Sequence, residues 1–345
     1  MSEFAVEVLP IRIEKHPDAD RIELAVVGEY RSIVGKGTFK DGDLVAYIPE
    51  QAIVPDEILV ELGLTGKLSG SNKNRVKAAR FRGVLSQGIC YPSRPEWVEG
   101  QDVTEILGIK KYEPKPPPSL TSKIFTGKKG SYFPDRTLKY DIENYKRFPN
   151  VLIDGEWVLI TEKLHGTFVG YSLVDNEFGI FSKGLGAQGF LIDPNQERPG
   201  LYVEIARKFG IEDKMRRVLV ASQPAFVLGE IFGQGVQDLQ YGTHEPTLRV
   251  FDIRIGEYYM GPNFLRSICG EMDLEMVPIL YEGPYSLEQT LKLRDGPDTI
   301  SGAHMREGVV VRSTSERRDK RIGRVQLKFV SDDYLCRGGK TTEFN

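Results

Sequence analysis

Short segments in which hydrophobic and polar residues alternate fill the first 92 residues of the chain. They include "FAVEVLPIRIEK", "RIELAVVG", "DLVAYIPE" and "GVLSQGICYP", and Gly, Asp and Pro turns separate them. Alternation with a period of two predicts β-strands that bury one face. Roughly five short strands of this kind are typical of a small barrel. We therefore expect a β-barrel at the N-terminal end.

Longer apolar runs follow in the second half of the chain. Those that predict strands are "GEWVLITEK", "FVGYSLV", "FGIFSKG", "AFVLGEIFG", "LRVFDIRIG", "EGVVVRST" and "RVQLKFVS". Helical periodicity occurs near "GLYVEIARKFG", "NFLRSICGEM" and "SLEQTLKLRDG". Strands and helices in this mixture predict an α+β domain of mainly antiparallel sheets with flanking helices.

A proline-rich segment separates the two patterns. The stretch "KKYEPKPPPSLTSK", residues 110–123, contains four prolines, which disfavour helix and sheet and favour a stiff, extended spacer. The expected organisation is a barrel domain over residues 1–113, a linker over 114–139 and a second domain over 140–345.

Composition fits two packed cores in an intracellular protein. The 345 residues are 40% hydrophobic and carry a formal net charge of -3, so a nucleic acid would be bound by local basic patches. No apolar run is long enough for a membrane span, and the N-terminus does not resemble a signal peptide. The three cysteines are far apart, which predicts neither a disulfide framework nor a zinc site. We expect a cytoplasmic or otherwise intracellular protein with no membrane association and no obligate protein partner.

One such basic patch lies between Lys67 and Arg82, where no acidic residue occurs. Basic side chains on a barrel face can pair with phosphates, although a solvated charge run is the alternative. Phe81 lies within this stretch and could stack on a base, but an aromatic residue in a strand is more often part of the core. The candidate nucleic-acid-binding residues are Lys73, Arg75, Lys77, Arg80 and Arg82.

Two segments of the barrel region are similar to a known family. "HPDADRIELA" and "RGVLSQGI" resemble the two signatures of the tRNA-binding OB-folds that are appended to some aminoacyl-tRNA synthetases. The resemblance implies an OB barrel that contacts structured or nicked nucleic acid without reading base identity.

The segment "WVLITEKLHGTFVGYSL" ends an apolar strand in Glu162, Lys163 and His165. A lysine attacks phosphorus only when it is unprotonated, and its ordinary pKa is about 10.4, so a nucleophilic lysine needs desolvation or nearby cations. Gly166 would let a nucleotide approach the backbone, and Glu162 is a polar handle for a base or ribose. A solvent-facing charge is the alternative reading for a lysine at a strand end.

Further strand ends supply the other groups that nucleotidyl transfer needs. "LGEIFG" contains Glu230, "VFDIR" contains Phe251, "REGVVVR" contains Glu307 and "VQLKFV" contains Lys328. Such a site requires a carboxylate for the ribose, an aromatic ring for adenine, a carboxylate for a divalent metal and a cation for phosphates.

In this order the segments resemble the motifs of the covalent nucleotidyltransferase superfamily of ATP-dependent ligases and capping enzymes. "EKLHGT" is similar to motif I of the K-x-H-G branch, which is typical of RNA ligases that seal nicks. The resemblance implies these roles: Lys163 as the nucleophile that carries AMP, Lys183 of "FSKG" near the nucleotide or nick phosphate, Glu230 on the ribose, Phe251 on adenine, Glu307 on a metal through water, and Lys328 on phosphates.

Four residues depart from the family pattern or extend it. Motif V is generally K-x-K, whereas here Gln326 precedes Lys328, which would act alone or with Arg324, Arg321 or Lys320 from a basic run that could equally be a solvated loop. A Gln326→Lys change is expected to be tolerated. His165 is a catalytic candidate that could orient a phosphate as a donor. The last candidates, for the 5′-phosphate at a nick, are Lys146 and Arg147.

Domain order points within the superfamily to the Deinococcus-type nick-sealing RNA ligases, in which an OB domain precedes the ligase core. The resemblance implies ATP as substrate, Mg2+ or Mn2+ as cofactor, and nicked duplex RNA or an RNA/DNA hybrid as partner. The reaction would seal 3′-OH/5′-phosphate nicks through lysyl-AMP and an adenylylated 5′ end, in RNA repair. The alternatives are an mRNA-capping-type guanylyltransferase, which uses GTP, and a non-catalytic tRNA-binding OB protein.

Overall fold

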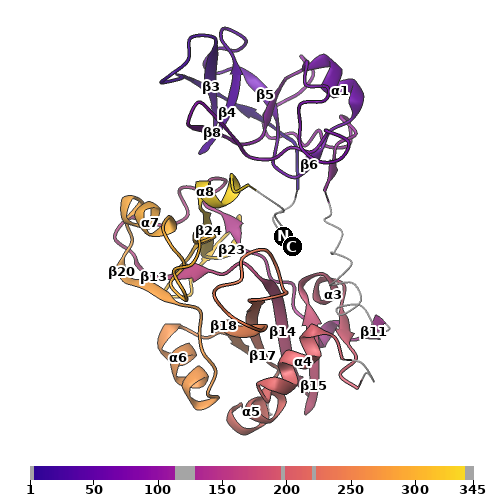
Figure 1. Cartoon of the computed structure of the whole chain (residues 1–345), viewed down its shortest axis with the longest axis vertical. Coiled ribbons are helices and arrows are strands. Elements are labelled where there is room, and N and C mark those ends of the chain that lie inside the picture. Colours follow the sequence, from indigo (N-terminus) through magenta and orange to yellow (C-terminus); the bar gives the residue numbers. More distant parts are fainter. Residues whose placement is uncertain (1–3, 113–128, 196–198, 220–222, 339–345) are drawn as a thin grey trace. The chain divides into compact units, whose positions relative to one another are not determined.

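The computed structural model describes residues 4–112, 129–195, 199–219 and 223–338. These residues form two compact units (Figure 1). The N-terminal unit contains residues 4–112 together with Tyr145–Pro149, and the C-terminal unit contains 129–144 and 150–338. Within the described ranges, no helix is long and apolar enough to cross a membrane.

Short antiparallel strands build the N-terminal unit. Two three-stranded sheets have the orders β1-β5-β9 and β2-β3-β4. Alternating residues such as Val8, Ala46 and Ile48 are completely buried, in agreement with the period-two pattern. The elements are β1 (Glu7–Pro10), β2 (Arg12–Lys15), β3 (Ile22–Val27), β4 (Tyr30–Gly35), β5 (Leu44–Ile48), β6 (Ala52–Ile53), α1 (Asp56–Glu61), β7 (Ala79–Phe81), β8 (Val84–Ser86), β9 (Ile89–Pro92) and β10 (Lys110–Lys111).

The unit boundaries differ from the sequence expectation in two places. Tyr145–Pro149 packs with the N-terminal unit, where Arg147 Nη2 lies 3.1 Å from Glu7 Oε1. Residues 114–128 of the expected linker lie outside the described residues. Residues 129–139 belong to the C-terminal unit rather than to a spacer, because they form strand β11 (Lys129–Tyr132) and the 3-10 helix η1 (Pro134–Arg136).

A seven-stranded antiparallel sheet, ordered β11-β16-β15-β14-β17-β18-β19, is the larger sheet of the C-terminal unit. Its other strands are β14 (Thr167–Val174), β15 (Glu177–Ser182), β16 (Phe190–Ile192), β17 (Ala225–Phe232), β18 (Thr247–Ile255) and β19 (Tyr258–Tyr259). Three helices lie beside it and share its largest apolar cluster (Figure 1): α4 (Leu201–Lys208), α5 (Ile211–Val218) and α6 (Pro262–Glu271). The short helix α3 (Lys183–Ala187) directly follows β15.

A second sheet of five strands has the order β12-β24-β21-β13-β20. Only its β12–β24 pair is parallel. The elements of this part are β12 (Glu143–Asn144), β13 (Trp157–Lys163), β20 (Ile279–Pro284), α7 (Leu287–Arg294), β21 (Gly308–Ser313), β22 (Arg318–Asp319), β23 (Gly323–Arg324), β24 (Gln326–Val330) and α8 (Asp332–Leu335).

The two large sheets are joined in sequence by Leu164, His165 and Gly166. Strand β13 of the five-stranded sheet ends at Lys163, and β14 of the seven-stranded sheet begins at Thr167. A Cβ at Gly166 would overlap the backbone carbonyl of Ile231, so no larger residue fits where the chain passes β17. The glycine is therefore required by this close backbone approach.

Candidate active site

Lys163 and Glu307 form an ion pair at the end of β13. In the antiparallel pairing of β13 with β21, Lys163 lies opposite Gly308, which brings the preceding Glu307 close. The distance from Lys163 Nζ to Glu307 Oε1 is 2.7 Å. Gly308 has a φ of 152°, and a Cβ there would overlap the backbone carbonyl of Phe329. The glycine after Glu307 thus allows β21 to start close to β24.

Three more charged residues belong to this site: two of them, Glu230 and Lys328, interact electrostatically with the pair, and the third, Lys183, interacts with those two. Glu230 comes from β17, Lys183 is the first residue of α3, and Lys328 comes from β24. Lys183 Nζ also lies 3.0 Å from Asp141 Oδ1. The structure therefore brings together five of the residues that the sequence predicted for the site.

The environment of these groups shifts their pKa values strongly. Burial alone would lower the pKa of Lys163, but the carboxylates of Glu307 and Glu230 hold it above its ordinary value. Burial, with repulsion from Lys163 and Lys183, lowers the pKa of Lys328 to about 8. Burial also raises the pKa of Glu230 to about 8 against the attraction of Lys163. The expected lowering of the Lys163 pKa is thus absent while Glu307 is its partner.

Glu162 precedes the lysine and contacts different residues. Its Oε2 accepts hydrogen bonds from the backbone N–H of Thr299 at 3.0 Å and from the Thr299 hydroxyl at 2.5 Å. Arg306 Nε lies 3.6 Å from the same oxygen. Within the described part of the chain, Glu162 Oε1 is buried and has no hydrogen-bond partner. Burial raises the pKa of this carboxyl, despite the hydrogen bonds from Thr299.

Aromatic rings from separate segments meet around Phe251. The ring of Tyr140 lies 5.4 Å from that of Phe251, and the ring of Phe168 lies 6.0 Å from it. Phe251 and Phe168 are only partly buried, so a flat group can still contact them. Phe251 also packs against the apolar cluster that contains Leu164, the residue that follows Lys163 in the sequence.

Gln326 belongs to a buried polar cluster around Asp252. The Tyr140 hydroxyl lies 2.8 Å from Asp252 Oδ2 and 3.2 Å from Gln326 Oε1. Arg312 Nη1 is 3.2 Å from Asp252 Oδ1, and Arg324 pairs with the same carboxylate. Arg324 Nε also lies 2.6 Å from Glu316 Oε2. Arg324 is thus engaged by two carboxylates, which disfavours the expected role of assisting Lys328 at phosphates.

His165 is almost completely buried, and its ring is held on both sides. Its Nε2 lies 2.8 Å from Asp238 Oδ1, and its Nδ1 lies 2.8 Å from the hydroxyl of Tyr334. Its backbone N–H donates to the hydroxyl of Tyr241 at 2.6 Å. Both ring nitrogens are occupied, so the expected donation to a phosphate is disfavoured in this arrangement. Asp238, the partner of His165 Nε2, also forms an ion pair with Arg337, whose Nε lies 3.0 Å from Asp238 Oδ2.

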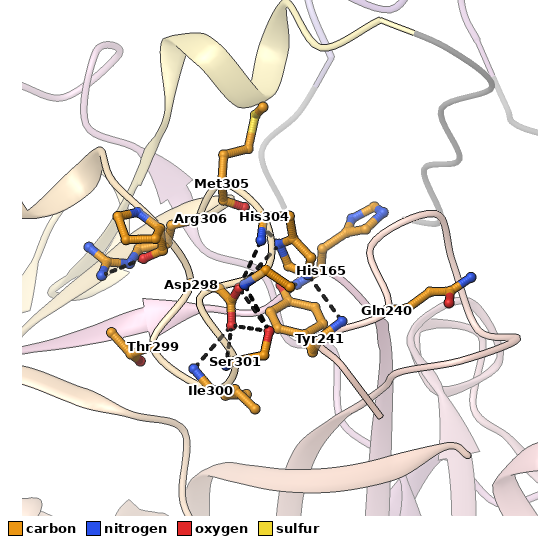
Figure 2. A network of polar contacts seen from close by, with 12 residues as sticks. His165, Gln240, Tyr241, Asp298, Thr299, Ile300, Ser301, His304, Met305 and Arg306 are labelled. Atoms are coloured by element: carbon orange, nitrogen blue, oxygen red, sulfur yellow. Dashed lines mark hydrogen bonds and ion pairs between the residues drawn. The ribbon is translucent and has the colours of Figure 1, made fainter. Parts of the chain in front are cut away.

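A loop that the sequence analysis did not single out supports both sides of Lys163. Figure 2 shows His165 and Tyr241 beside the loop over residues 298–306. His304 Nε2 accepts the backbone N–H of Tyr241 at 3.0 Å, and the backbone N–H of His304 lies 3.2 Å from Asp298 Oδ2. Thr299 of the same loop binds Glu162. One local pattern in the sequence indicated a turn here, because an aspartate often accepts a hydrogen bond from a backbone N–H a few residues further on. In the structure, Asp298 Oδ1 accepts the backbone N–H of Ser301 at 2.7 Å.

The basic candidates of the N-terminal unit are not equally accessible. Lys73, Arg80 and Arg82 are exposed, whereas Lys77 is partly buried. Arg75 is also partly buried, with its guanidinium 3.7 Å from the ring centroid of Tyr112.

The two remaining candidates lie in Tyr145–Pro149. Lys146 is buried and donates to Gln87 Oε1, while Arg147 pairs with Glu7. A nick phosphate could reach Lys146 only if the contact with Gln87 opened, which disfavours that assignment.

A partly buried lysine at a strand end between two mainly antiparallel sheets, close to carboxylates and aromatic rings, is the arrangement of a nucleotidyltransferase. A family model described as RNA ligase matches residues 155–330, and a model for an OB-fold domain matches residues 8–93. The chain belongs to the RNA ligase family. The expected α+β fold class, with an OB barrel preceding the ligase domain, is confirmed.

Solved structures agree with this fold. A lysine-to-alanine mutant of Naegleria gruberi RNA ligase with ATP and Mn has a TM-score of 0.78 and 23% identity, covering 96% of this chain and 98% of that chain. The same RNA ligase with PPi has a TM-score of 0.79 and 24% identity, covering 96% and 98%. A search of curated proteins finds no match.

Proposed function

We propose that the protein is an ATP-dependent RNA ligase that seals 3′-OH/5′-phosphate nicks in duplex RNA or RNA/DNA hybrids, as part of RNA repair. The observation that carries the proposal is the pairing of Lys163 with Glu307 at 2.7 Å, where Glu230, Lys183 and Lys328 also act on the site. ATP is an intracellular metabolite, so the proposal also places the protein inside the cell. No obligate protein partner is required by this scheme.

Lys163 Nζ attacks the α-phosphorus of ATP, forming a P–N bond while the bond to the bridging oxygen breaks and pyrophosphate leaves. The amine must first lose a proton, and Glu307 and Glu230 oppose this by raising its pKa. Once Glu307 turns away to another cation, burial dominates and favours the neutral amine. Lys328 would face the negative charge of the phosphates.

Glu307 would hold the divalent cation, and Glu230, which is expected on the ribose, is a second carboxylate that acts on the same lysine. Within the described residues, no group of three or more His, Cys, Asp or Glu could hold a metal by itself. Mg2+ is usually bound through one or two carboxylates together with substrate phosphates and water, so one carboxylate suffices. Mg2+ or Mn2+ bound there would offset charge on the phosphates. The Naegleria gruberi RNA ligase structures, one with ATP and Mn and one with PPi, support ATP as the substrate and a divalent metal as the cofactor.

The base would lie against Phe251, near Phe168 and Tyr140. Glu162 Oε1 is a buried acceptor that has no partner in the described part of the molecule. The 6-amino group of adenine is a donor of the kind it lacks, whereas guanine has a carbonyl at that position. With the 6-position of the base facing this oxygen, adenine supplies the missing donor and guanine does not, which favours ATP over GTP and argues against a capping-type guanylyltransferase.

In the later steps the 5′-phosphate of the nick attacks the AMP phosphorus and releases Lys163, and the 3′-hydroxyl then attacks the activated 5′-phosphate and releases AMP. Exposed basic residues of the N-terminal unit, Lys73, Arg80 and Arg82, are suited to duplex phosphates. A non-catalytic tRNA-binding protein would have no use for the paired charges around Lys163.

Incubation with ATP labelled at the α-phosphate, in the presence of Mg2+ or Mn2+, tests the first step. We expect label to remain on the denatured wild-type protein and on Lys292→Ala, which changes an exposed lysine on α7 of the same unit. Lys163→Ala should take up none. Labelling of Lys163→Ala would overturn the assignment of the nucleophile, and equal labelling by GTP would favour the guanylyltransferase.

A further inference from the structure

Hairpin β7–β8 of the N-terminal unit presents an aromatic ring to solvent. Phe81 pairs with Val84 across a two-residue turn formed by Arg82 and Gly83. Both turn residues have positive φ values, 45° and 84°, as tight hairpin turns require. The Phe81 side chain is 47% exposed, so it is not the core residue that an aromatic in a strand more often is.

The backbone beneath this ring is fixed by a buried histidine. His16 is completely buried, and its Nδ1 accepts the backbone N–H of Asp18 at 3.1 Å. The proton of a neutral His16 ring is therefore on Nε2, which donates to the backbone carbonyl of Phe81 at 3.1 Å. Arg82 Nη1 donates to the backbone carbonyl of Asp18 at 2.9 Å. The hairpin tip is thus held in place before any ligand binds, which lowers the entropy cost of binding.

Positive charge flanks the ring on the same hairpin. Arg80 and Arg82 are exposed, and no acidic residue occurs between Lys67 and Arg82 in the sequence. An exposed aromatic ring between cations matches a nucleic acid, which offers a flat base next to phosphates. Bases inside a duplex are already stacked on both faces, whereas an unpaired base offers a free face to the ring.

We propose that Phe81 stacks on an unpaired nucleobase of the RNA substrate while Arg80 and Arg82 contact the adjoining phosphates. This inference rests on the proposed function, because it assumes an RNA substrate. It adds that the substrate carries an unpaired nucleotide next to its duplex, rather than being a continuous duplex with a nick alone.

Fluorescence anisotropy with two RNA probes tests the inference on the full chain. One probe is a blunt nicked duplex, and the other is the same duplex with a single-stranded extension. Stacking on one base is worth about 1–3 kcal/mol, so Phe81→Ala should weaken binding to the extended probe by about tenfold, and Phe81→Leu should do the same. Phe81→Trp should retain binding, and its added fluorescence should be quenched by the extended probe. Phe264→Ala, which removes a 69% exposed phenylalanine from α6, is the matched control and should bind like wild type.

Unchanged binding of Phe81→Ala to the extended probe would overturn the inference. An equal loss on both probes would also overturn it, because Phe81 would then contact the duplex. Thermal unfolding of each variant should match wild type, since the ring is exposed. Labelling of the wild-type protein by ATP is measured on the same preparation. If the protein is labelled but binds the two RNA probes equally well, the inference alone is contradicted. If the protein is not labelled, the proposed function is contradicted.

Discussion

The hydroxyl of Tyr334 lies 2.8 Å from Nδ1 of His165, although 169 residues separate the two in the chain. This contact ties helix α8, which follows β24, to the segment that carries Lys163. In a neutral His165 ring, Nε2 donates to the carboxylate oxygen of Asp238 that lies 2.8 Å away, and Nδ1 accepts from the hydroxyl of Tyr334.

Tyr334→Phe should therefore leave a buried acceptor without its donor and lower the free energy of unfolding by about 1–3 kcal/mol. Self-adenylylation should slow, because the residue two positions after Lys163 loses its support. Urea unfolding and label transfer measure the two effects. Tyr258→Phe, at an exposed site on β19, serves as the control. Wild-type stability in Tyr334→Phe would show that the contact contributes nothing.

Glu307→Gln should separate two roles of one carboxylate. The charge of Glu307 raises the pKa of Lys163, so its removal should lower that pKa and increase the neutral fraction of the amine at any given pH below it. Without ATP, Lys163 should then react faster with an amine reagent near neutral pH, as followed by mass spectrometry. Adenylylation should nevertheless fall by about 100-fold, because the carboxylate that fits the cation is lost. Slower amine modification would contradict this reading.

Lys328→Met should make the protein more stable but less active. Burial and two nearby lysines lower the Lys328 pKa to about 8, so folding disfavours its charged form. The penalty is complete below about pH 8 and disappears as pH rises through the ordinary lysine value of about 10.4. The variant should unfold at a higher temperature than wild type at neutral pH, with the gain shrinking toward high pH. Label transfer from ATP should fall by about 100-fold. A lower unfolding temperature at neutral pH would contradict the pKa assignment.

Gln326→Lys should destabilise the protein, contrary to the tolerance expected from sequence. The new ammonium would lie beside Arg324 and Arg312, and Asp252 already pairs with both. An unsatisfied buried charge costs several kcal/mol, whereas Gln326→Met removes only the acceptor that Tyr140 and Arg324 share and should cost about 1 kcal/mol. Urea unfolding distinguishes the two. A Gln326→Lys protein that is as stable as wild type and seals nicks faster would mean that the glutamine merely replaces a phosphate-binding lysine.

Glu162→Gln tests the choice of base. The amide keeps one acceptor oxygen and adds a donor, which suits the carbonyl of guanine better than the amino group of adenine. We expect labelling by ATP to fall and labelling by GTP to rise relative to wild type. Thr299→Val removes one hydroxyl donor to the same carboxylate and is the control for a structural effect that does not depend on the base. It should leave the ratio of ATP to GTP use unchanged. An unchanged ratio in Glu162→Gln would remove Glu162 from base recognition.

The strands and the charged site could be predicted because their signals are local. Alternation marked the strands, and charged residues at strand ends converge when neighbouring strands pair, as Lys163 and Glu307 do. The partners of His165 could not be predicted, since Asp238 and Tyr334 lie 73 and 169 residues away. From the sequence, Gln326 is interpreted as the loss of a phosphate-binding lysine. Its contacts with the Asp252 cluster could not be predicted, because the members of that cluster come from distant segments. Burial of Lys146 likewise depends on Gln87, which is 59 residues away.

Lys163 is the last residue of strand β13 in one sheet, and Thr167 is the first residue of strand β14 in the other. An AMP group bonded to this lysine would therefore lie next to the three-residue segment that connects the two sheets. If one sheet shifted or rotated relative to the other, the nucleotide would move with the sheet that carries Lys163. The position of a nucleotide bonded to Lys163 would thus depend on the angle between the two sheets.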